Sequence, residues 1–310
     1  MLTGAGYIGA ALLRRLIDPR CAPGASPVVV LDNFFSTARE DVEAALPPNT
    51  TLIEGDVAEP ADVARAFAAL PDAPITVFHL AAQPSAAIAA REPTVTERSN
   101  LVGARVVLEA ARARDAHVVF GGSFRVYGDE LIGKTVDEDT PYGRLGDLSH
   151  LSKVYVEQLA RMLGVRFTSV RLGVTYGLSP VMKTAPAFMT VPNLFCQRAA
   201  RGEALDVLED RPMAFIHVAD AARALLAGAH LTTAERWQVV NAAPEVATIG
   251  EVGRIVQRLA RQHEGRAELR GATPSEATLE VRSRMPLQPC HTLATGLGEV
   301  LDYFSCLAKP

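Results

Sequence analysis

A glycine-rich turn near the start of the chain constrains the fold more than any other stretch. Residues 2–10 carry Gly4, Gly6 and Gly9 and lead from a short apolar strand into an amphipathic run over residues 10–17. At this spacing the first glycine permits a tight turn, the second lets the backbone approach a pyrophosphate, and the third lets the helix pack close to the strand. The free N–H groups at the start of that helix attract anions. The turn therefore predicts a cradle for a dinucleotide phosphate; an ordinary glycine-rich turn is the alternative.

An acidic residue at the end of the next apolar run strengthens this interpretation. Residues 28–32 form a valine-rich strand that ends in Asp32. In dinucleotide-binding folds a carboxylate roughly 20 residues beyond the glycine turn accepts hydrogen bonds from the adenosine ribose. Its charge would repel a 2′-phosphate, so Asp32 favours NAD over NADP.

Composition excludes several classes of function. The chain has 310 residues, of which 48% are hydrophobic, and its net charge is −4. Without a long run of Lys and Arg, it does not have the charge pattern of a protein that binds nucleic acid or an anionic membrane. No apolar run is long enough to span a bilayer, so we expect a globular cytoplasmic protein without a signal segment.

Cysteine and lysine are both sparse. The four cysteines have no metal-like or redox-like spacing, so we predict neither a metal site nor a disulfide; they are Cys21, Cys196, Cys290 and Cys306. The chain has only these four lysines: Lys134, Lys153, Lys183 and Lys309. A lysine at a position where the mechanism needs one is therefore less easily ascribed to chance.

Short β-branched runs alternate with longer helical ones as far as about Val170. Beyond the stub at Met1 and Leu2, the expected strands are 28–32, 51–54, 76–80, 117–120 and 166–171. Such alternation predicts an α/β fold, a Rossmann-type doubly wound parallel sheet. Because the first strand is so short, we expect either that the sheet tolerates a stub or that the true start lies a few codons upstream.

The alternation of strands and helices becomes less regular after the last of these strands. We predict an NAD-binding domain over residues 1–172 with a returning segment around 205–230, and a smaller substrate-binding lobe over 173–310. The segments expected in this part are 193–201, 205–208, 215–220 leading into a helix through 229, 249–263 and 293–304.

Three polar residues near the strand ends allow two interpretations each. Asp56, after the third strand, either faces an adenine edge or caps a turn. His79 is either a satisfied core histidine, the interpretation we favour, or a ligand. Asn100 opens a helix that runs to Ala113 and either caps that helix or braces the neighbouring strand.

Taken in order, the motifs resemble the extended short-chain dehydrogenase/reductase family, the NAD-dependent epimerases and dehydratases of nucleotide sugars. The resemblance covers essentially the whole chain and rests on residues 3–9, 31–33, 55–57, 79–82, Asn100, Ser123 with 126–128, 152–153, Arg171 with 176–177, and 215–220. The segment around Ser123 lacks the Asp-Glu pair of similar 4,6-dehydratases and looks more like the epimerase branch.

This resemblance implies an NAD cofactor and a nucleotide-sugar substrate. The residues it assigns to the cofactor are Gly4, Gly6, Tyr7, Ile8, Gly9, Asp32, Asn33, Asp56, Val57, Leu80, Ala81, Ala82, Asn100 and Lys153. The implied chemistry oxidises a sugar C–OH and then returns the hydride. Ser123 would donate a hydrogen bond to the reacting oxygen, and Lys153 would lower the pKa of a tyrosine four residues before it.

That tyrosine is missing, because Ser149 occupies the position. An aliphatic hydroxyl is a far weaker acid than a phenol and reaches less far. Three substitutes remain open: a water held between Ser149 and Lys153, His150 as the base, or another tyrosine entering the site, Tyr127 or Tyr142. Tyr155 is expected to face away.

The substrate side departs from the family as well. Val174 stands where similar enzymes keep an asparagine, and Met213-Ala214 replaces an Arg-Asp pair, although Arg211 is close by. These positions usually hold the substrate diphosphate. Arg125 falls where a small residue would face the sugar, so it either pairs with a substrate carboxylate or phosphate or is a solvated surface arginine.

Two functions are therefore compatible with the sequence. One is an NAD-dependent epimerase or dehydratase that uses Ser123, Ser149 and Lys153; the other is a catalytically silent NAD-binding homologue that serves as a sensor or partner subunit. The resemblance also implies a homodimer formed through the helices at about 98–113 and 149–163.

Overall fold

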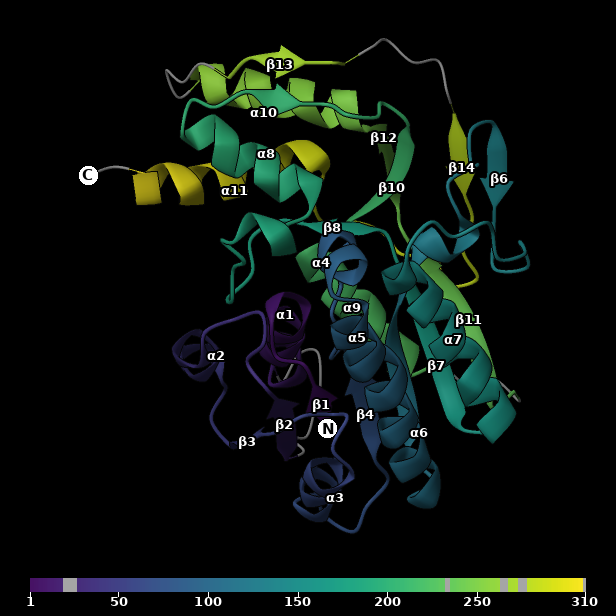
Figure 1. Ribbon diagram of the computed structural model, residues 1–310. Helices are drawn as coiled ribbons and strands as arrows, with labels where there is room; N and C mark the ends of the chain where they lie inside the picture. Colours follow the sequence, from purple (N-terminus) through teal and green to yellow (C-terminus); the bar gives the residue numbers. More distant parts are fainter. Residues whose placement is uncertain (19–26, 232–234, 263–266, 273–277, 309–310) are drawn as a thin grey trace.

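The structure is a computed structural model that describes residues 1–18, 27–231, 235–262, 267–272 and 278–308 (Figure 1). Cys21, Lys309 and the last residue of the expected segment 249–263 lie outside the described residues.

A seven-stranded parallel sheet forms the centre of the molecule, which confirms the predicted α/β architecture. The strand order is β11-β7-β5-β4-β1-β2-β3. In that order the strands are β11 (Trp237–Ala242), β7 (Arg166–Leu172), β5 (His117–Ser123), β4 (Thr76–His79), β1 (Leu2–Thr3), β2 (Val28–Asp32) and β3 (Thr50–Glu54). The valine-rich runs suit central strands because helices cover both of their faces.

The two-residue strand β1 lies between β2 and β4. Leu2 pairs with Val30 on one side and with Phe78 on the other, and its side chain is fully buried. The edge strand β11 was not identified as a strand from the sequence. Gln238 and Asn241 interrupt its apolar residues. Among the described strands it pairs with β7, which lies far from it in the sequence.

Helices cover the sheet on both faces. The helices that precede β7 are α1 (Tyr7–Leu16), α2 (Arg39–Ala45), α3 (Pro60–Ala68), α4 (Ala86–Arg91), α5 (Pro93–Thr96), α6 (Gly103–Ala113) and α7 (Leu148–Leu163), and α9 (Val218–Ala229) returns to the sheet from the later part of the chain. Residues of α1 and α9 share one apolar core with the sheet, whereas residues of α3, α6 and α7 share the other.

Asn100 corrects the expected start of the long helix. It lies inside a π-helical turn, η1 (Glu97–Val102), that joins α5 to α6 without a break. The buried Asn100 amide accepts the Gln83 N–H at 2.7 Å and donates to the Gln83 carbonyl at 3.0 Å and to Ser152 Oγ at 3.0 Å. It therefore braces the chain after β4, and it does not cap a helix.

The second part of the chain forms the smaller structure at the top of Figure 1. Its elements are β8 (Val174–Tyr176), η3 (Pro186–Phe188), α8 (Val191–Ala200), β9 (Leu205–Asp206), β10 (Pro212–His217), β12 (Glu245–Thr248), α10 (Ile249–Gln262), β13 (Leu269–Arg270) and α11 (Leu293–Ala308). A short two-stranded sheet of β6 (Lys134–Val136) and β14 (Leu279–Val281) lies beside it. The short 3₁₀ helix η2 (Phe124–Tyr127) follows β5. Across the described ranges, none of the helices is both long and apolar enough to cross a bilayer.

Candidate functional site

A cavity of about 430 Å³ lies where the carboxyl ends of the central strands meet the second part of the chain. Its walls come from the glycine-rich turn, the ends of β2, β4, β5 and β7, the first turns of α7, and residues 183 and 187–190. The volume falls within the range of about 300–1,000 Å³ that is typical of small-molecule sites.

The three glycines of the turn serve two different purposes. Gly4 has φ +83°, and a Cβ there would lie 2.6 Å from the Ala81 nitrogen; at Gly9 a Cβ would lie 2.1 Å from the Gly4 oxygen. Packing within the protein requires both. At Gly6 a Cβ would contact only Thr37 Cγ2, at 3.6 Å, so the space beside it is open. Because Gly6 lines the cavity at the start of α1, this space fits a phosphate group that approaches the helix N-terminus.

Asp32 holds the glycine turn in place. Its Oδ2 accepts the N–H of Ala5 at 2.6 Å, and its Oδ1 accepts the N–H of Phe34 at 2.7 Å. The carboxylate also lines the cavity, together with Asn33. It is thus placed at the end of β2 as the sequence predicts for a ribose-binding group.

Ser123 and Lys153 reach the same cavity from different elements. Ser123 ends β5, and its Oγ accepts the Arg125 N–H at 3.2 Å. Lys153 Nζ donates to the Gly121 carbonyl at 2.8 Å and lies 4.7 Å from the centre of the Phe120 ring. Burial lowers the pKa of Lys153 to about 8, against the opposing effect of the Glu157 charge.

Ser149 and His150 take different directions from the same turn of α7. Ser149 is buried, its Oγ donates to Asp147 Oδ1 at 2.6 Å, and it is absent from the cavity wall. His150 lines the cavity, and its Nδ1 lies 2.5 Å from Asp147 Oδ2. The predicted catalytic position of Ser149 therefore has a hydroxyl directed at a carboxylate, whereas the next residue faces the cavity.

Neither of the two candidate tyrosines lines the cavity. Tyr127 donates to Asn241 Oδ1 at 2.8 Å and accepts from Arg171 Nη1 at 2.7 Å, and burial raises its pKa to about 12. Tyr142 donates to Glu157 Oε2 at 2.8 Å; burial, followed by the Glu157 charge, raises its pKa to about 12. Tyr155 accepts a hydrogen bond from Arg105 at 3.0 Å in an exposed position. All three phenols have partners elsewhere.

Two of the three predicted substrate-side residues line the cavity, and the third lies in a pocket beside it. Arg125 and Val174 both line the cavity. Arg211 lies beside Arg125 in a small adjoining pocket, and Asp129 bridges the two guanidinium groups at 2.5 and 2.6 Å. With 23% of its side chain exposed, Arg125 is not a solvated surface arginine.

The remaining cofactor candidates divide into two groups. Those that line the cavity are Tyr7, Ile8, Val57, Leu80, Ala81 and Ala82. Asp56 and Asn100 are outside the wall: Asp56 accepts the Ala58 N–H at 2.8 Å and pairs with Arg98 at 3.1 Å, as a turn aspartate does. His79 is a buried core histidine whose Nδ1 lies 2.7 Å from Thr3 Oγ1.

The sequence prediction did not include several residues of the cavity wall, among them a lysine and two phenylalanines. Lys183, Phe35 and Phe188 line it, and Lys183 Nζ lies 5.4 Å from the centre of the Phe188 ring. Burial lowers the pKa of Lys183 to about 8, although the Asp32 charge acts in the opposite direction. The scarcity of lysine was the signal that could have identified this residue.

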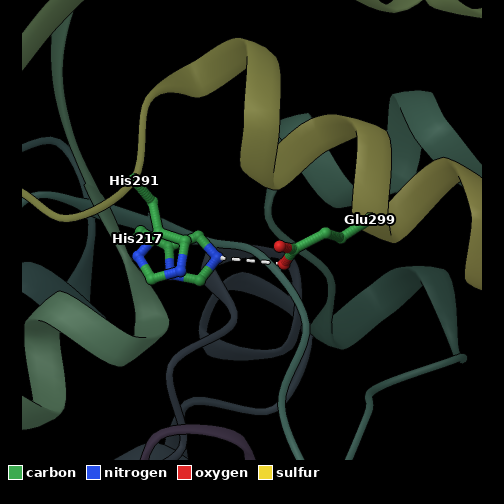
Figure 2. A group of neighbouring side chains, drawn as sticks. All are labelled: His217, His291 and Glu299. Carbon is green, nitrogen blue, oxygen red and sulfur yellow. Dashed lines mark ion pairs between the residues drawn. The ribbon is translucent and has the colours of Figure 1, made fainter.

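A second group of ionisable side chains lies away from the cavity, between β10 and α11 (Figure 2). One nitrogen each from His217 and His291 and a Glu299 carboxylate oxygen lie within 4.8 Å of one another. The two imidazole rings are stacked with their centres 3.8 Å apart. Because each lone pair lies in the plane of its ring and the two planes are nearly parallel, the two lone pairs do not converge on one ion.

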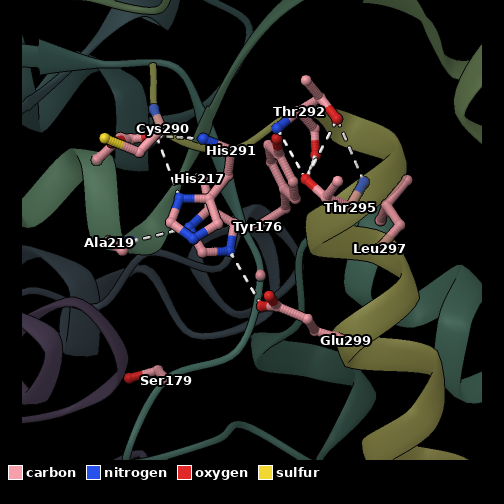
Figure 3. Close-up of polar contacts among 12 residues, drawn as sticks. Tyr176, Ser179, His217, Ala219, Cys290, His291, Thr292, Thr295, Leu297 and Glu299 are labelled. Carbon is pink, nitrogen blue, oxygen red and sulfur yellow. Dashed lines mark hydrogen bonds and ion pairs between the residues drawn. The ribbon is translucent and has the colours of Figure 1, made fainter. Parts of the chain in front are cut away.

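The hydrogen bonding of His217 also argues against a metal. Its Nδ1 accepts the Ala219 N–H at 3.2 Å and thereby caps α9 (Figure 3). Burial lowers the pKa of His217 to about 4, so the ring is neutral near pH 7 and carries its proton on Nε2. That protonated Nε2 faces Glu299 at 3.9 Å and has no lone pair for a cation. We therefore interpret this group as a structural helix cap.

Comparison with known proteins gives a family match over most of the chain. The family model described as "NAD dependent epimerase/dehydratase family" matches residues 1–243. Among curated proteins, the chain is 26% identical to UDP-glucuronic acid decarboxylase 3 of Arabidopsis thaliana over 237 residues, which cover 72% of this chain and 63% of the plant protein. It is 27% identical to UDP-glucose 4-epimerase of Streptococcus mutans over 183 residues, which cover 58% of this chain and 52% of that enzyme.

Solved structures agree with the observed fold. The UDP-glucose 4-epimerase of Thermus thermophilus, solved as a complex with NAD, is 25% identical and superposes with a TM-score of 0.78. The superposition covers 98% of this chain and 97% of that one.

Proposed function

The chain belongs to the NAD dependent epimerase/dehydratase family, and on this basis we propose that it is an NAD-dependent enzyme that acts on a nucleotide-linked sugar. The observation that carries the proposal is the convergence of the glycine cradle, Asp32, Ser123 and Lys153 on a single cavity. Transient oxidation of a sugar hydroxyl needs both a cofactor site and an acid–base site, and a single cavity lined by both sets of candidate residues supports the proposal.

The residues present fit NAD. Gly6 leaves room for a phosphate at the start of α1, and Asp32 suits a ribose without a 2′-phosphate. Lys183 supplies a positive charge to the same cavity, where it interacts with the charge of Asp32. When bound there, NAD would supply a hydride acceptor for the sugar carbon and later return the hydride.

Lys153 and Ser123 would arrange the reacting sugar. Lys153 is held by the Gly121 carbonyl at the end of β5, close to Ser123 on the same strand. Its ammonium would hold the nicotinamide ribose and lower the pKa of a neighbouring acid. Ser123 would donate a hydrogen bond to the sugar oxygen that reacts.

The other end of the cavity suits an anionic part of the substrate. Arg125 and Arg211 place two guanidinium groups around Asp129. An incoming phosphate or carboxylate would find bidentate donors there. We therefore propose a nucleotide sugar as the substrate class and include uronic acids, which carry a carboxylate, among the candidates.

One observation favours a second candidate function. Ser149 replaces the proton-carrying tyrosine, and its hydroxyl is directed at Asp147. A catalytically silent homologue that binds NAD as a sensor or partner subunit would tolerate this replacement.

We also propose that the protein is a homodimer. The helices α6 and α7 lie side by side, and apolar side chains on and just before them are exposed, including Val102 at 46% and Leu151 at 51%. Sedimentation of the purified protein would test this. A Leu151→Glu variant is expected to shift the population towards monomer.

A product assay tests the function. The purified protein would be incubated with NAD and a panel of UDP-, dTDP- and GDP-sugars that includes uronic acids, and products would be separated and identified by mass. The proposal predicts a new isomer or a product of changed mass that disappears in Lys153→Met. No product from any sugar, with NAD binding confirmed in the same sample, would favour the silent homologue.

A further inference from the structure

We propose that His150, oriented by Asp147, is the proton carrier that replaces the missing tyrosine. The proposal rests on the proposed function, because it names the acid–base group of that same site. Its starting point is the first turn of α7, where three neighbouring residues form one connected arrangement: Asp147, Ser149 and His150.

Asp147 is fixed by several donors at once. As the N-cap of α7 it accepts the His150 N–H at 3.0 Å, and it also accepts the Ser149 hydroxyl at 2.6 Å. Burial alone would raise the pKa of Asp147, but the hydrogen bonds from His150 and Ser149 lower it well below its ordinary value. The carboxylate is therefore charged throughout the neutral range and rigidly held.

This carboxylate sets the orientation and tautomer of the imidazole. Asp147 Oδ2 lies 2.5 Å from His150 Nδ1. Since an ionised carboxylate only accepts hydrogen bonds, Nδ1 must carry a proton in this contact. The neutral ring then has its lone pair on Nε2, which is the arrangement of a general base whose other nitrogen is held by a carboxylate.

The same orientation brings the imidazole to the reacting groups. His150 lines the cavity that contains Ser123 and Lys153. His150 and Lys153 are three residues apart on α7, so they share one helix face. The side chain of His150 is 24% exposed, as expected for a group at a cavity wall that a substrate can reach.

The other side chains considered as proton carriers are occupied elsewhere. Ser149 uses its hydroxyl proton in the bond to Asp147, whereas Tyr127 and Tyr142 are bonded to Arg171 and Glu157 respectively, away from the cavity. Ser149 is thereby reassigned from proton carrier to a second anchor for Asp147. Asp147 is a positioning residue, and His150 is the catalytic one.

The proton balance of the proposed step is simple. The O–H bond of the sugar breaks, its proton passes to Nε2, and the C=O bond forms as the hydride leaves the same carbon for bound NAD. The imidazolium that results is stabilised by Asp147. When the hydride returns to the carbonyl carbon, Nε2 gives the proton back to the oxygen, so that His150 is regenerated in each turnover.

The test compares His150→Gln and Asp147→Asn with Ser149→Ala and the unchanged protein. We expect His150→Gln to lower kcat by about 10²–10⁴-fold, the usual contribution of a general acid–base group, while NAD and UDP affinities stay unchanged. Asp147→Asn keeps a good N-cap residue but cannot hold the Nδ1 proton as an anion does, so kcat should fall strongly as well. Ser149→Ala removes one anchor of Asp147 but leaves the contact between Asp147 and His150 Nδ1, so kcat should fall far less than in His150→Gln.

A spectroscopic readout that needs neither substrate nor turnover accompanies the kinetics. A proton shared between Nδ1 and a carboxylate is expected at low field in the ¹H NMR spectrum of the protein without NAD, present in Ser149→Ala and absent from both His150→Gln and Asp147→Asn. Absence of this resonance from the unchanged protein would overturn the proposed pairing.

The kinetic outcomes separate the two proposals. If the unchanged protein forms product and His150→Gln does so at the same rate, His150 is not the carrier and the proposed function still stands. If the unchanged protein binds NAD and forms no product, the proposed function fails, and the catalytic role of His150 fails with it.

Discussion

Arg171 and Glu157 form an ion pair inside the protein, with Nη2 and Oε2 2.7 Å apart and the two side chains 3% and 0% exposed. Glu157 also accepts hydrogen bonds from Ser169 at 2.7 Å and from Tyr142 at 2.8 Å, and Arg171 donates to Tyr127. The pair therefore fixes two of the tyrosines that could otherwise have served the active site.

Breaking this pair should destabilise the protein severely. Arg171→Met leaves the Glu157 charge buried without its partner, and we expect the free energy of unfolding to fall by about 3–5 kcal/mol. Urea denaturation measures this change in the free energy of unfolding. Arg105→Met, which removes an exposed pair with Glu109 at 3.7 Å and an exposed hydrogen bond to Tyr155, is the control and should cost at most about 1 kcal/mol. Equal losses in the two variants would contradict the account.

Tyr127→Phe should separate stability from catalysis. The variant loses the hydrogen bonds of the phenol to Asn241 and Arg171, which should lower the free energy of unfolding by about 1–3 kcal/mol. Because the phenol is outside the cavity, kcat should scarcely change. A fall in kcat as large as the one expected for His150→Gln, in a variant that remains folded, would identify Tyr127 as the proton carrier.

A methyl group added to the glycine turn should be harmful where packing is tight. In Gly9→Ala the new Cβ would lie 2.1 Å from the Gly4 oxygen, so the free energy of unfolding should fall by about 1–3 kcal/mol or more. Gly298→Ala in α11, where nothing lies within 4 Å of a Cβ, should be neutral or stabilising by up to about 1 kcal/mol. Thermal unfolding distinguishes the two; a stable Gly9→Ala protein would refute the packing argument.

Asp32→Ala should weaken NAD binding strongly, because it removes both the expected ribose acceptor and the anchor of Ala5 in the glycine turn. Ser149→Ala should scarcely change NAD binding, since its hydroxyl bonds to Asp147 away from the cavity wall. Isothermal titration of the two variants measures the difference. Equal loss of affinity in both would contradict the assigned roles.

Acid should destabilise the protein through its buried histidines. Burial, followed by the charge of Lys153, lowers the pKa of His79 to about 3, and burial lowers that of His117 to about 4. Unfolded histidine takes up a proton near pH 6.5. Below that pH the unfolded state binds more protons, so stability that is present above about pH 6.5 is lost by up to about 1.4 kcal/mol per pH unit for each histidine.

The loss of stability continues as the pH falls to the pKa values of the two histidines in the folded protein, about 3 for His79 and about 4 for His117. The thermal midpoint should therefore fall steadily from pH 7 to pH 5, and the fall should be smaller in His79→Gln. An identical decline in that variant would show that His79 is not a buried neutral histidine.

Local sequence patterns predicted the frame of the fold and many of the residues that line the cavity. The glycine spacing and the acidic end of β2 act over short distances, which explains why Gly6 and Asp32 are found where they were expected. The alternation of strands and helices likewise depends on local periodicity. Asn100 was misplaced because a π-helical turn carries no pattern that distinguishes it from the helix on either side.

The arrangement of the candidate proton-transfer residues depends on contacts that no local sequence pattern predicts. Adjacent residues of a helix point about 100° apart, so only the rotation of α7 on the sheet decides whether Ser149 or His150 faces the cavity. Asp147 acquires its role from bonds made within one turn of that helix. Lys183 lies on a segment without regular structure. Its charge interacts with that of Asp32, which is more than a hundred residues earlier in the sequence.

The most direct test of the central claim measures how much NAD the protein uses. Protein freed of bound nucleotide would be given a nucleotide sugar with none or with a small amount of NAD, and both product and NAD would be quantified after many turnovers. We expect no product without NAD, product in large excess over the NAD supplied, and NAD recovered in its oxidised form. NAD that binds while no product forms, or one NAD consumed for each product, would contradict this expectation.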